Sequence, residues 1–299
     1  DWDPLPYTQG KVTQVDSDYL DIEVIAPFIA KKGLHTEAII GYDPEKRRMA
    51  RRFTDHYQLG FEKTTEVVGP GIMRLFIGRK DRFSGTMPVV GTYVIARHQV
   101  YGYQSFELEK CKNVHLENIN IYSNPGMGVT GDECRDISIR HLKVMLRPGT
   151  GRWMSCTADA THFAGCRGTI TMENCLFEGM GDDATNVRSG HYLLVSERLG
   201  NNKLRIKAGY RYGSDLTPPE TGDKLELSSE DKPLLPYATL TVNSVERDTI
   251  NKSLIIGFSE KLPERTIKGD AVGNASSIPV LRIRNCTTIR NRSRGFIIK

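Results

Sequence analysis

Three aspartates are spaced so that they can meet in one cluster. Asp182 and Asp183 are adjacent and follow Gly179 and Gly181, and Asp159 lies upstream of them. Like charges a few ångströms apart oppose joint ionisation, so one carboxyl of such a cluster holds a proton near neutral pH while its neighbours stay charged. The cluster can therefore supply an acid and a base at the same pH.

The interval from Asp159 to Asp182 is also a repeat length of this chain. Segments that start at Cys111 and Cys134 match at that same interval with their apolar residues in step, a third copy starts at Cys166 and is one residue longer, and a fourth covers 280–286. The copies carry Ile, Val, Thr and Phe at period two, which is typical of strands, and they lack the helical half of a leucine-rich repeat. We therefore predict an all-β chain built on a parallel β-helix.

Stacking of such coils would place Asp159 about one strand spacing, roughly 4.7 to 4.9 Å, from the aspartate pair. Neighbouring residues of a regular strand point to opposite faces, which would bury one member of the pair. Gly179 and Gly181 predict a turn or bulge at this point, so that Asp182 and Asp183 both face one groove.

The cysteines follow the same repeat. Cys111, Cys134 and Cys166 occupy one repeat position, and Cys175 and Cys286 share another, which favours ladders of small buried side chains over disulfides. No cysteine or histidine spacing suggests a zinc site. The alternative metal would be calcium held by the three aspartates, because hard cations take clustered carboxylates.

The chain resembles glycoside hydrolase family 110, the inverting exo-α-1,3-galactosidases, in its blocks at 158–163, 166–168 and 182–187. Blocks at 3–10, 126–129 and 292–295 extend the resemblance over most of the chain. The resemblance implies a right-handed parallel β-helix with inserted β-barrel domains, and a three-aspartate site that maps onto Asp159, Asp182 and Asp183.

An aspartate followed one repeat later by an aspartate pair is also similar to the arrangement in polygalacturonases, another inverting β-helix family. By that analogy Asp182 is the general acid, and Asp159 with Asp183 positions and deprotonates water.

Two stretches lack the cysteine register and read as small β-barrels spliced between coils. Each begins with a hairpin-like pattern and has a later strand after a glycine, at 91–95 and at 222–227. The expected organisation is a β-barrel-like insert at 1–98, coils with the catalytic cluster at 99–189, a second insert at 190–278, and a return to the coils at 279–299.

Further residues are candidates for binding the substrate. Alignment of the 280–286 copy on the third copy places Arg292 and Arg294 one coil beyond the aspartate pair, where they would bond sugar hydroxyls and tune the carboxylates, or form an exposed salt bridge. The other candidates, close in sequence, are His162, Asn186, Arg188 and Trp153. An aromatic face suits a galactose ring, although a structural role is the alternative for His162 and Trp153.

Composition narrows the class of protein. The chain has 299 residues, is 38% hydrophobic, and carries a net charge of +5 that is spread along the sequence. It lacks the broad basic face of a nucleic-acid binder, and its apolar runs fall well short of the roughly 20 residues of a membrane span. We interpret it as a fragment of a secreted or periplasmic enzyme whose coils continue beyond both ends, and a homo-oligomer is compatible with it.

The resemblance to glycoside hydrolase family 110 implies an inverting glycoside hydrolase without a cofactor, which would remove terminal α-1,3-linked galactose from blood-group-B-like or linear oligosaccharides and glycans. The alternatives are a polygalacturonase-like hydrolase, a calcium-dependent polysaccharide lyase and a non-catalytic carbohydrate-binding solenoid. A uronate-cutting enzyme would line its cleft with Lys and Arg, whereas an exo-enzyme for neutral galactose needs a closed pocket, for which the inserts can supply walls.

Overall fold

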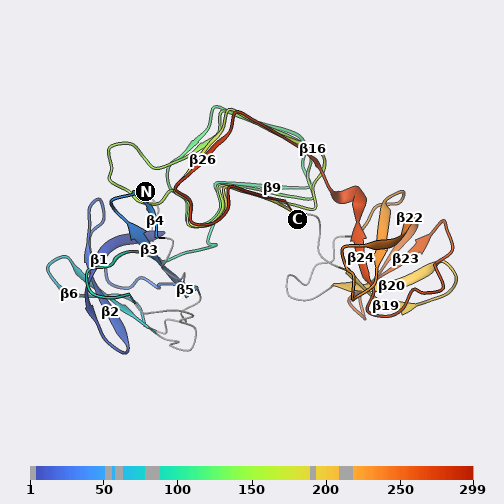
Figure 1. The fold of residues 1–299 in the computed structure, drawn as a ribbon, viewed down its shortest axis with the longest axis horizontal. Helices are drawn as coiled ribbons and strands as arrows, with labels where there is room; N and C mark the ends of the chain where they lie inside the picture. The colour runs from blue at the N-terminus through green and yellow to red at the C-terminus, as the bar shows by residue number, and fades with distance from the viewer. Residues whose placement is uncertain are drawn as a thin grey trace.

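A computed structural model of the chain describes residues 5–50, 56–57, 63–77, 88–188, 193–208 and 218–298. These residues form an all-β fold with one short 3-10 helix, η2 (Ala275–Ser277). Parallel sheets occupy the middle of the molecule, and an antiparallel sheet and a barrel lie on either side of them (Figure 1). Within the described ranges, no helix has the length and apolar character of a membrane span.

Each successive coil adds one strand to each of three parallel sheets. The first sheet has the order β27-β18-β15-β12-β9, the second β10-β13-β16-β25 and the third β11-β14-β17-β26. Their bounds are β9 (Phe106–Glu109), β10 (Lys112–Glu117), β11 (Asn120–Ile121), β12 (Val129–Asp132), β13 (Arg135–Arg140), β14 (Lys143–Val144), β15 (Thr161–Ala164), β16 (Arg167–Glu173), β17 (Leu176–Glu178), β18 (Thr185–Arg188), β25 (Val280–Arg284), β26 (Thr287–Ile289) and β27 (Phe296–Ile298).

The strand registers confirm the repeat that the sequence predicts. Val114 pairs with Ile137, which is the match expected from the alignment of the first two copies, and Ile137 pairs in turn with Ile170. The extra residue of the third copy is a register shift after Arg135, at Gly168, whose φ is 67°. Alternating side chains of these strands therefore fall into columns along the stack.

One corner of the coils repeats the same backbone conformation. The residues that follow the second-sheet strands have φ between 51° and 57°, the left-handed region, in all four coils: Asn118, His141, Asn174 and Asn285. Asparagine tolerates this region better than most residues because its short polar side chain can bond locally. Each second-sheet strand therefore ends directly before one of these corners.

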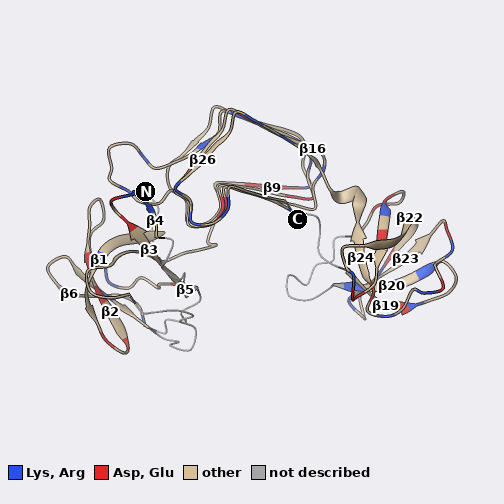
Figure 2. Cartoon of the chain, in the orientation of Figure 1, with Lys and Arg blue, Asp and Glu red and all other residues tan. Residues whose placement is uncertain are grey.

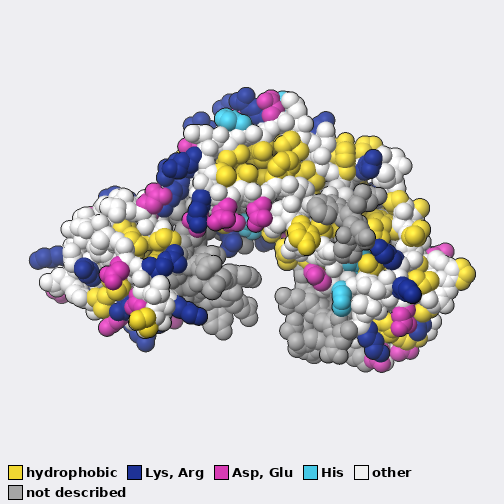
Figure 3. All heavy atoms as spheres, turned by 180° about the vertical axis from the view of Figure 1, so that it is seen from behind, with side chains coloured by type: hydrophobic (Ala, Val, Ile, Leu, Met, Phe, Trp, Pro, Cys, Tyr) yellow, Lys and Arg dark blue, Asp and Glu magenta, His cyan; other side chains and the backbone are white. Residues whose placement is uncertain are grey.

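Inward-pointing residues of the three sheets form one apolar core, which includes Val129, Ile139, Phe163 and Phe177. All six cysteines lie in described ranges and are free, as the ladder interpretation expects. The first and last coils carry partly buried apolar residues packed against this core, and apolar side chains gather on the coils in the view of Figure 3.

The first flanking part is an eight-stranded antiparallel sheet with the order β4-β3-β8-β1-β2-β7-β6, and β5 also pairs with β3. Its core includes Val12, Leu20, Ile22 and Met73. The bounds are β1 (Tyr7–Val15), β2 (Tyr19–Val24), β3 (Ala38–Asp43), β4 (Arg48–Met49), β5 (His56–Tyr57), β6 (Glu66–Gly69), β7 (Ile72–Phe76) and β8 (Tyr93–Arg97).

The second flanking part is a closed barrel inserted between β18 and β25, with the order β19-β20-β23-β22-β21-β24. Buried Arg167 of β16 binds Asp223 of the barrel through two hydrogen bonds of 2.7 Å, which anchors the barrel to the coils. Both charge signs are interspersed over the barrel and the sheet (Figure 2). The bounds are β19 (Leu193–Arg198), β20 (Lys203–Ala208), β21 (Lys224–Ser228), β22 (Pro236–Asp248), β23 (Ser253–Phe258) and β24 (Ala271–Asn274).

Candidate active site

The three aspartates lie on stacked turns that lead from the third parallel sheet into the first. The N–H of Ala160 donates to the carbonyl of Asp183, and the N–H of Ala184 donates to the carbonyl of Arg294 in the next coil. Thr161 pairs with Thr185, so Asp159 stands under Asp183 and not under Asp182. This coil is therefore one residue longer than the interval from Asp159 to Asp182, and Asp182 lies one position outside the column.

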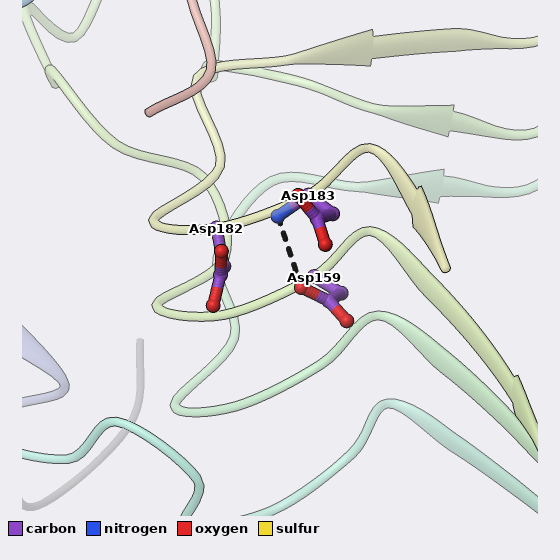
Figure 4. A group of neighbouring side chains, drawn as sticks. All are labelled: Asp159, Asp182 and Asp183. Carbon is purple, nitrogen blue, oxygen red and sulfur yellow. Dashed lines mark hydrogen bonds between the residues drawn. The ribbon is translucent and has the colours of Figure 1, made fainter. Parts of the chain in front are cut away.

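Close backbone packing shapes the turn of the pair. Gly179 has a φ of 72°, a conformation that favours glycine, and a Cβ on Gly181 would lie 2.3 Å from the carbonyl oxygen of Thr157 in the coil below. The side chain of Asp182 then points toward the turn of Asp159 (Figure 4). One ligand atom from each of the three carboxyls lies within 4.8 Å of the others.

Asp159 is 3% exposed and its two oxygens have separate partners. Oδ1 accepts a 2.9 Å hydrogen bond from the N–H of Asp183, and Oδ2 lies 2.7 Å from Nδ1 of His162. Nε of Arg188 donates to Nε2 of His162 at 3.2 Å, so the imidazole proton is on Nδ1 and His162 donates to Asp159. This chain of contacts fixes the orientation of the Asp159 carboxyl.

Asp183 is 1% exposed and is bound on both oxygens by Arg294. The backbone N–H and Nε of Arg294 donate to Oδ1 at 2.9 and 2.8 Å, and Nη2 donates to Oδ2 at 3.0 Å. Burial alone would raise the pKa of Asp183, but the hydrogen bonds from Arg294 outweigh it and hold the pKa below its usual range. Asp183 is therefore charged over the physiological range.

Asp182 has the opposite environment. Burial, and then the charges of Asp159 and Asp183, raise its pKa, whereas Arg292 and Arg97 act in the other direction. Nη1 of Arg292 lies 3.7 Å from Oδ1 of Asp182, a looser contact than the fork of Arg294 on Asp183. The cluster thus holds one carboxyl whose pKa is raised beside one whose pKa is lowered, which is the direction of separation that general acid-base catalysis requires.

The structure brings most of the other sequence-predicted residues to this cluster. Arg292 and Arg294 contact the pair, His162 contacts Asp159, and Nδ2 of Asn186 lies 3.5 Å from Oδ2 of Asp183. Arg188 contacts His162, which in turn contacts Asp159.

Trp153 has a different environment from these residues. Its ring stacks on Tyr42 with a centroid distance of 4.3 Å and meets the edge of Tyr93, both from the antiparallel sheet. Met154 extends this junction, because Tyr7 donates a 2.5 Å hydrogen bond to its carbonyl. The contacts of Trp153 therefore support the structural alternative, docking of the sheet on the coils.

Arg97 is the functional candidate that sequence patterns missed. It is the last residue of β8, is fully buried, and donates from Nη1 to the carbonyl of Thr157 at 2.8 Å. Its one sequence signal is a charged residue after the apolar run Val94, Ile95 and Ala96. That signal cannot indicate a partner as distant along the chain as Thr157.

The donor set bears on whether the cluster holds a metal ion. Three aspartates with ligand atoms this close could bind a hard cation such as calcium. However, both oxygens of Asp183 already accept from Arg294, and Oδ2 of Asp159 accepts from His162. A divalent cation would have to displace or face these donors, so the arrangement suits a shared proton better than a metal.

No family model matches the chain. It is 27% identical over 316 aligned residues to alpha-1,3-galactosidase A of Shewanella woodyi, and 28% identical over 321 to alpha-1,3-galactosidase B of Bacteroides thetaiotaomicron; each alignment covers 100% of this chain and 50% of the relative. Alpha-1,3-galactosidase B of Akkermansia muciniphila is 30% identical over 239 residues, 80% of this chain and 29% of that protein.

The chain thus spans about half the length of the first two relatives. The two alignments nevertheless cover the whole of this chain. The chain belongs to glycoside hydrolase family 110.

Proposed function

We propose that this protein is an inverting exo-α-1,3-galactosidase, which removes terminal α-1,3-linked galactose from oligosaccharides or glycans, either blood-group-B-like or linear. The observation that carries the proposal is the pairing of Asp182, whose pKa is raised, with buried Asp183, whose pKa is lowered, in one cluster. The names of the curated relatives supply the sugar and the linkage.

In this mechanism Asp182 donates its proton to the glycosidic oxygen as the bond to the anomeric carbon breaks. Asp159 and Asp183 hold a water molecule and accept its proton as its oxygen attacks the opposite face of the sugar. His162 and Arg294 fix these two carboxylates through the hydrogen bonds described above. The bond from the anomeric carbon to the aglycone is exchanged for a bond to the water oxygen. The base carboxylates then carry the proton of that water and Asp182 is ionised, and proton exchange with solvent restores both starting states.

The separation of the carboxyls and the family resemblance point in different directions on stereochemistry. Acid and base are roughly 6.5 to 9.5 Å apart in most inverting glycosidases and about 5 to 5.5 Å apart in retaining ones. The 4.8 Å limit within this cluster is nearer the second range. We propose inversion because the family resemblance implies it, and because the bidentate contact with Arg294 and the lowered pKa make Asp183 a weaker nucleophile toward the anomeric carbon.

The charges around the cluster favour a neutral sugar over a uronate. The Arg294 guanidinium is bound to Asp183, and Arg292 lies beside Asp182. Arg97 donates to backbone carbonyls. Because these cations balance acceptors of the protein itself, a neutral galactose fits the site better than a carboxylated sugar does.

We further propose the architecture that the resemblance implies. The three parallel sheets would form a right-handed parallel β-helix at 99–189 and 279–299, and the flanking parts at 1–98 and 190–278 would be inserted β-barrel domains. The closed barrel of β19 to β24 and the eight-stranded sheet of β1 to β8 support this division. The enzyme would act on glycans outside the cytoplasm, in a secreted or periplasmic form.

The test is incubation with p-nitrophenyl α-galactoside and with an α-1,3-linked galactosyl disaccharide. Released galactose would support the proposed activity, and proton NMR recorded before mutarotation should show β-galactose first. First-formed α-galactose would refute inversion while leaving the galactosidase assignment in place. Unsaturated products that absorb in the ultraviolet would instead indicate a lyase.

A further inference from the structure

Arg97 contacts both turns that carry the aspartates. Its Nη1 lies 2.8 Å from the carbonyl oxygen of Thr157, two residues before Asp159, and 3.5 Å from the carbonyl oxygen of Gly181, directly before Asp182. The side chain is among the largest that are fully buried in the described part of the chain. One guanidinium from the antiparallel sheet thus lies against two successive coils at the point where their carboxyls meet.

The packing around this contact leaves little space for movement. A Cβ on Gly181 would lie 2.3 Å from the carbonyl oxygen of Thr157 and 3.2 Å from Nη1 of Arg97. Oγ1 of Thr157 donates to the carbonyl of Val100 at 3.1 Å, so the segment that follows β8 holds the same turn a second time. A shift of the antiparallel sheet would therefore move the turn of Asp159 with it.

We propose that Arg97 is a positioning residue of the active site, which holds the turns of Asp159 and Asp182 at a fixed separation and places a buried positive charge beside the acid. The proposal deepens the galactosidase function proposed above and rests on it. It also makes the first flanking sheet a part of the catalytic unit, since that sheet delivers the guanidinium.

The charge has a chemical purpose. Four charged side chains act on Asp182: Asp159 from the turn below, Asp183 from its own turn, Arg292 from the last coil and Arg97 from the sheet. Burial and the two carboxylates raise the pKa of Asp182. An acid whose pKa is too high releases its proton poorly to a leaving group. Arg97 opposes that rise, so the carboxyl stays a usable acid.

The experiment compares Arg97→Met and Arg97→Lys with the unmodified protein by two measurements. The first needs no substrate: a carbon-13 NMR titration of the aspartate carboxyls, in which Asp182→Asn assigns the Asp182 signal. The second is the pH dependence of kcat/KM for galactose release. Arg74→Met is the matched control, because Arg74 lies in the same sheet and its ion pair is with Asp21 on β2.

We expect Arg97→Met to titrate Asp182 at higher pH, to move the basic limb of the rate profile the same way, and to lower kcat roughly 10²-fold with little change in KM, because the carboxyls are misplaced. Arg97→Lys should recover the titration, since it keeps the charge, but only part of kcat, since an ammonium lacks the planar fork. Arg74→Met should change neither measurement.

Unchanged titration and kcat in folded Arg97→Met would overturn the proposal, as would a lower melting temperature with normal activity per folded molecule. If Arg97→Met does not fold, Arg97→Lys decides: reduced kcat with a normal titration supports the positioning role, and a normal kcat refutes it. If the unmodified protein releases no galactose, the proposed function fails, and the titration alone still decides whether Arg97 controls Asp182.

Discussion

The backbone N–H of Asp183 donates a 2.9 Å hydrogen bond to Oδ1 of Asp159, the carboxylate beneath it in the stack. In a parallel coil such an N–H normally donates to a backbone carbonyl, whereas here it donates to a side chain. Because the bond is made at full burial, it fixes the distance between two charged groups more tightly than side-chain packing could. The coil itself therefore sets how the two carboxylates that are assigned to the water lie relative to each other.

Replacing the acid should give a loss that depends on the leaving group. Asp182→Asn is expected to lower turnover of an α-1,3-linked disaccharide by roughly 10²- to 10⁴-fold, the usual worth of a general acid. The loss on p-nitrophenyl α-galactoside should be much smaller, since nitrophenolate leaves without protonation. Asp183→Asn is the control and should lose both rates alike; rescue in Asp183→Asn and not in Asp182→Asn would exchange the two roles.

Replacing the arginine that binds Asp183 should move the acidic limb of the pH-rate profile. The hydrogen bonds of Arg294 hold the pKa of Asp183 down, so Arg294→Met should raise it, and the charged form needed for catalysis would then appear only at higher pH. The midpoint of the acidic limb of kcat/KM should rise accordingly. Arg282→Met, on the exposed face of β25 in the same coil, should leave that midpoint in place. An unshifted limb in Arg294→Met would show that Asp183 is not the titrating base.

A methyl group at Gly181 should disturb the site without removing any functional group. The added Cβ would lie 2.3 Å from the Thr157 carbonyl, so the two turns must separate. We expect Gly181→Ala to lower kcat roughly 10²-fold, the scale of an ångström-sized misplacement. Gly273→Ala is the matched control, because no heavy atom lies within 4 Å of its Cβ. Equal rates in the two variants would contradict the account of the turn.

Chelation should leave galactose release unchanged. Two of the three carboxylates accept hydrogen bonds from Arg294 and His162, which leaves the cluster poorly suited to a divalent cation. Initial rates measured with and without EDTA, and again after added calcium, test this directly. A loss in EDTA that calcium restores would favour the calcium-dependent alternative.

Buried His98 should make the antiparallel sheet sensitive to acid. Burial lowers the pKa of His98 from 6.5 to about 4. Between these two pH values His98 is protonated in the unfolded chain and neutral in the folded chain. Its contribution to stability is complete above pH 6.5 and is lost as the pH falls toward 4, by about 2 kcal/mol at about pH 5 from the linkage relation. Urea unfolding of the protein and of His98→Gln at about pH 7.5 and about pH 5 measures this difference. An equal loss in the variant would assign the acid sensitivity to other groups.

The sequence by itself determined the coils. Apolar residues at period two, cysteines one repeat apart and polar residues such as Asn118 and Asn174 at the corners are local properties, and parallel stacking copies each of them from one coil to the next. Stacking of equivalent positions also predicts that Asp159 lies near the aspartate pair, and that Arg292 and Arg294 lie one coil further on. These predictions succeeded because each contact joins equivalent positions of a periodic structure.

Only the tertiary structure decided what the repeat does not encode. One extra residue between Asp159 and Asp183 changed which aspartate stands in the column, and the stacking of Trp153 on Tyr42 assigned that ring to the junction with the sheet. Arg97 reached the site from outside the repeat altogether. No period relates a residue of an inserted sheet to a coil, so such contacts depend on how two separately folded parts pack, a sum of many small surface interactions that no short stretch of sequence specifies.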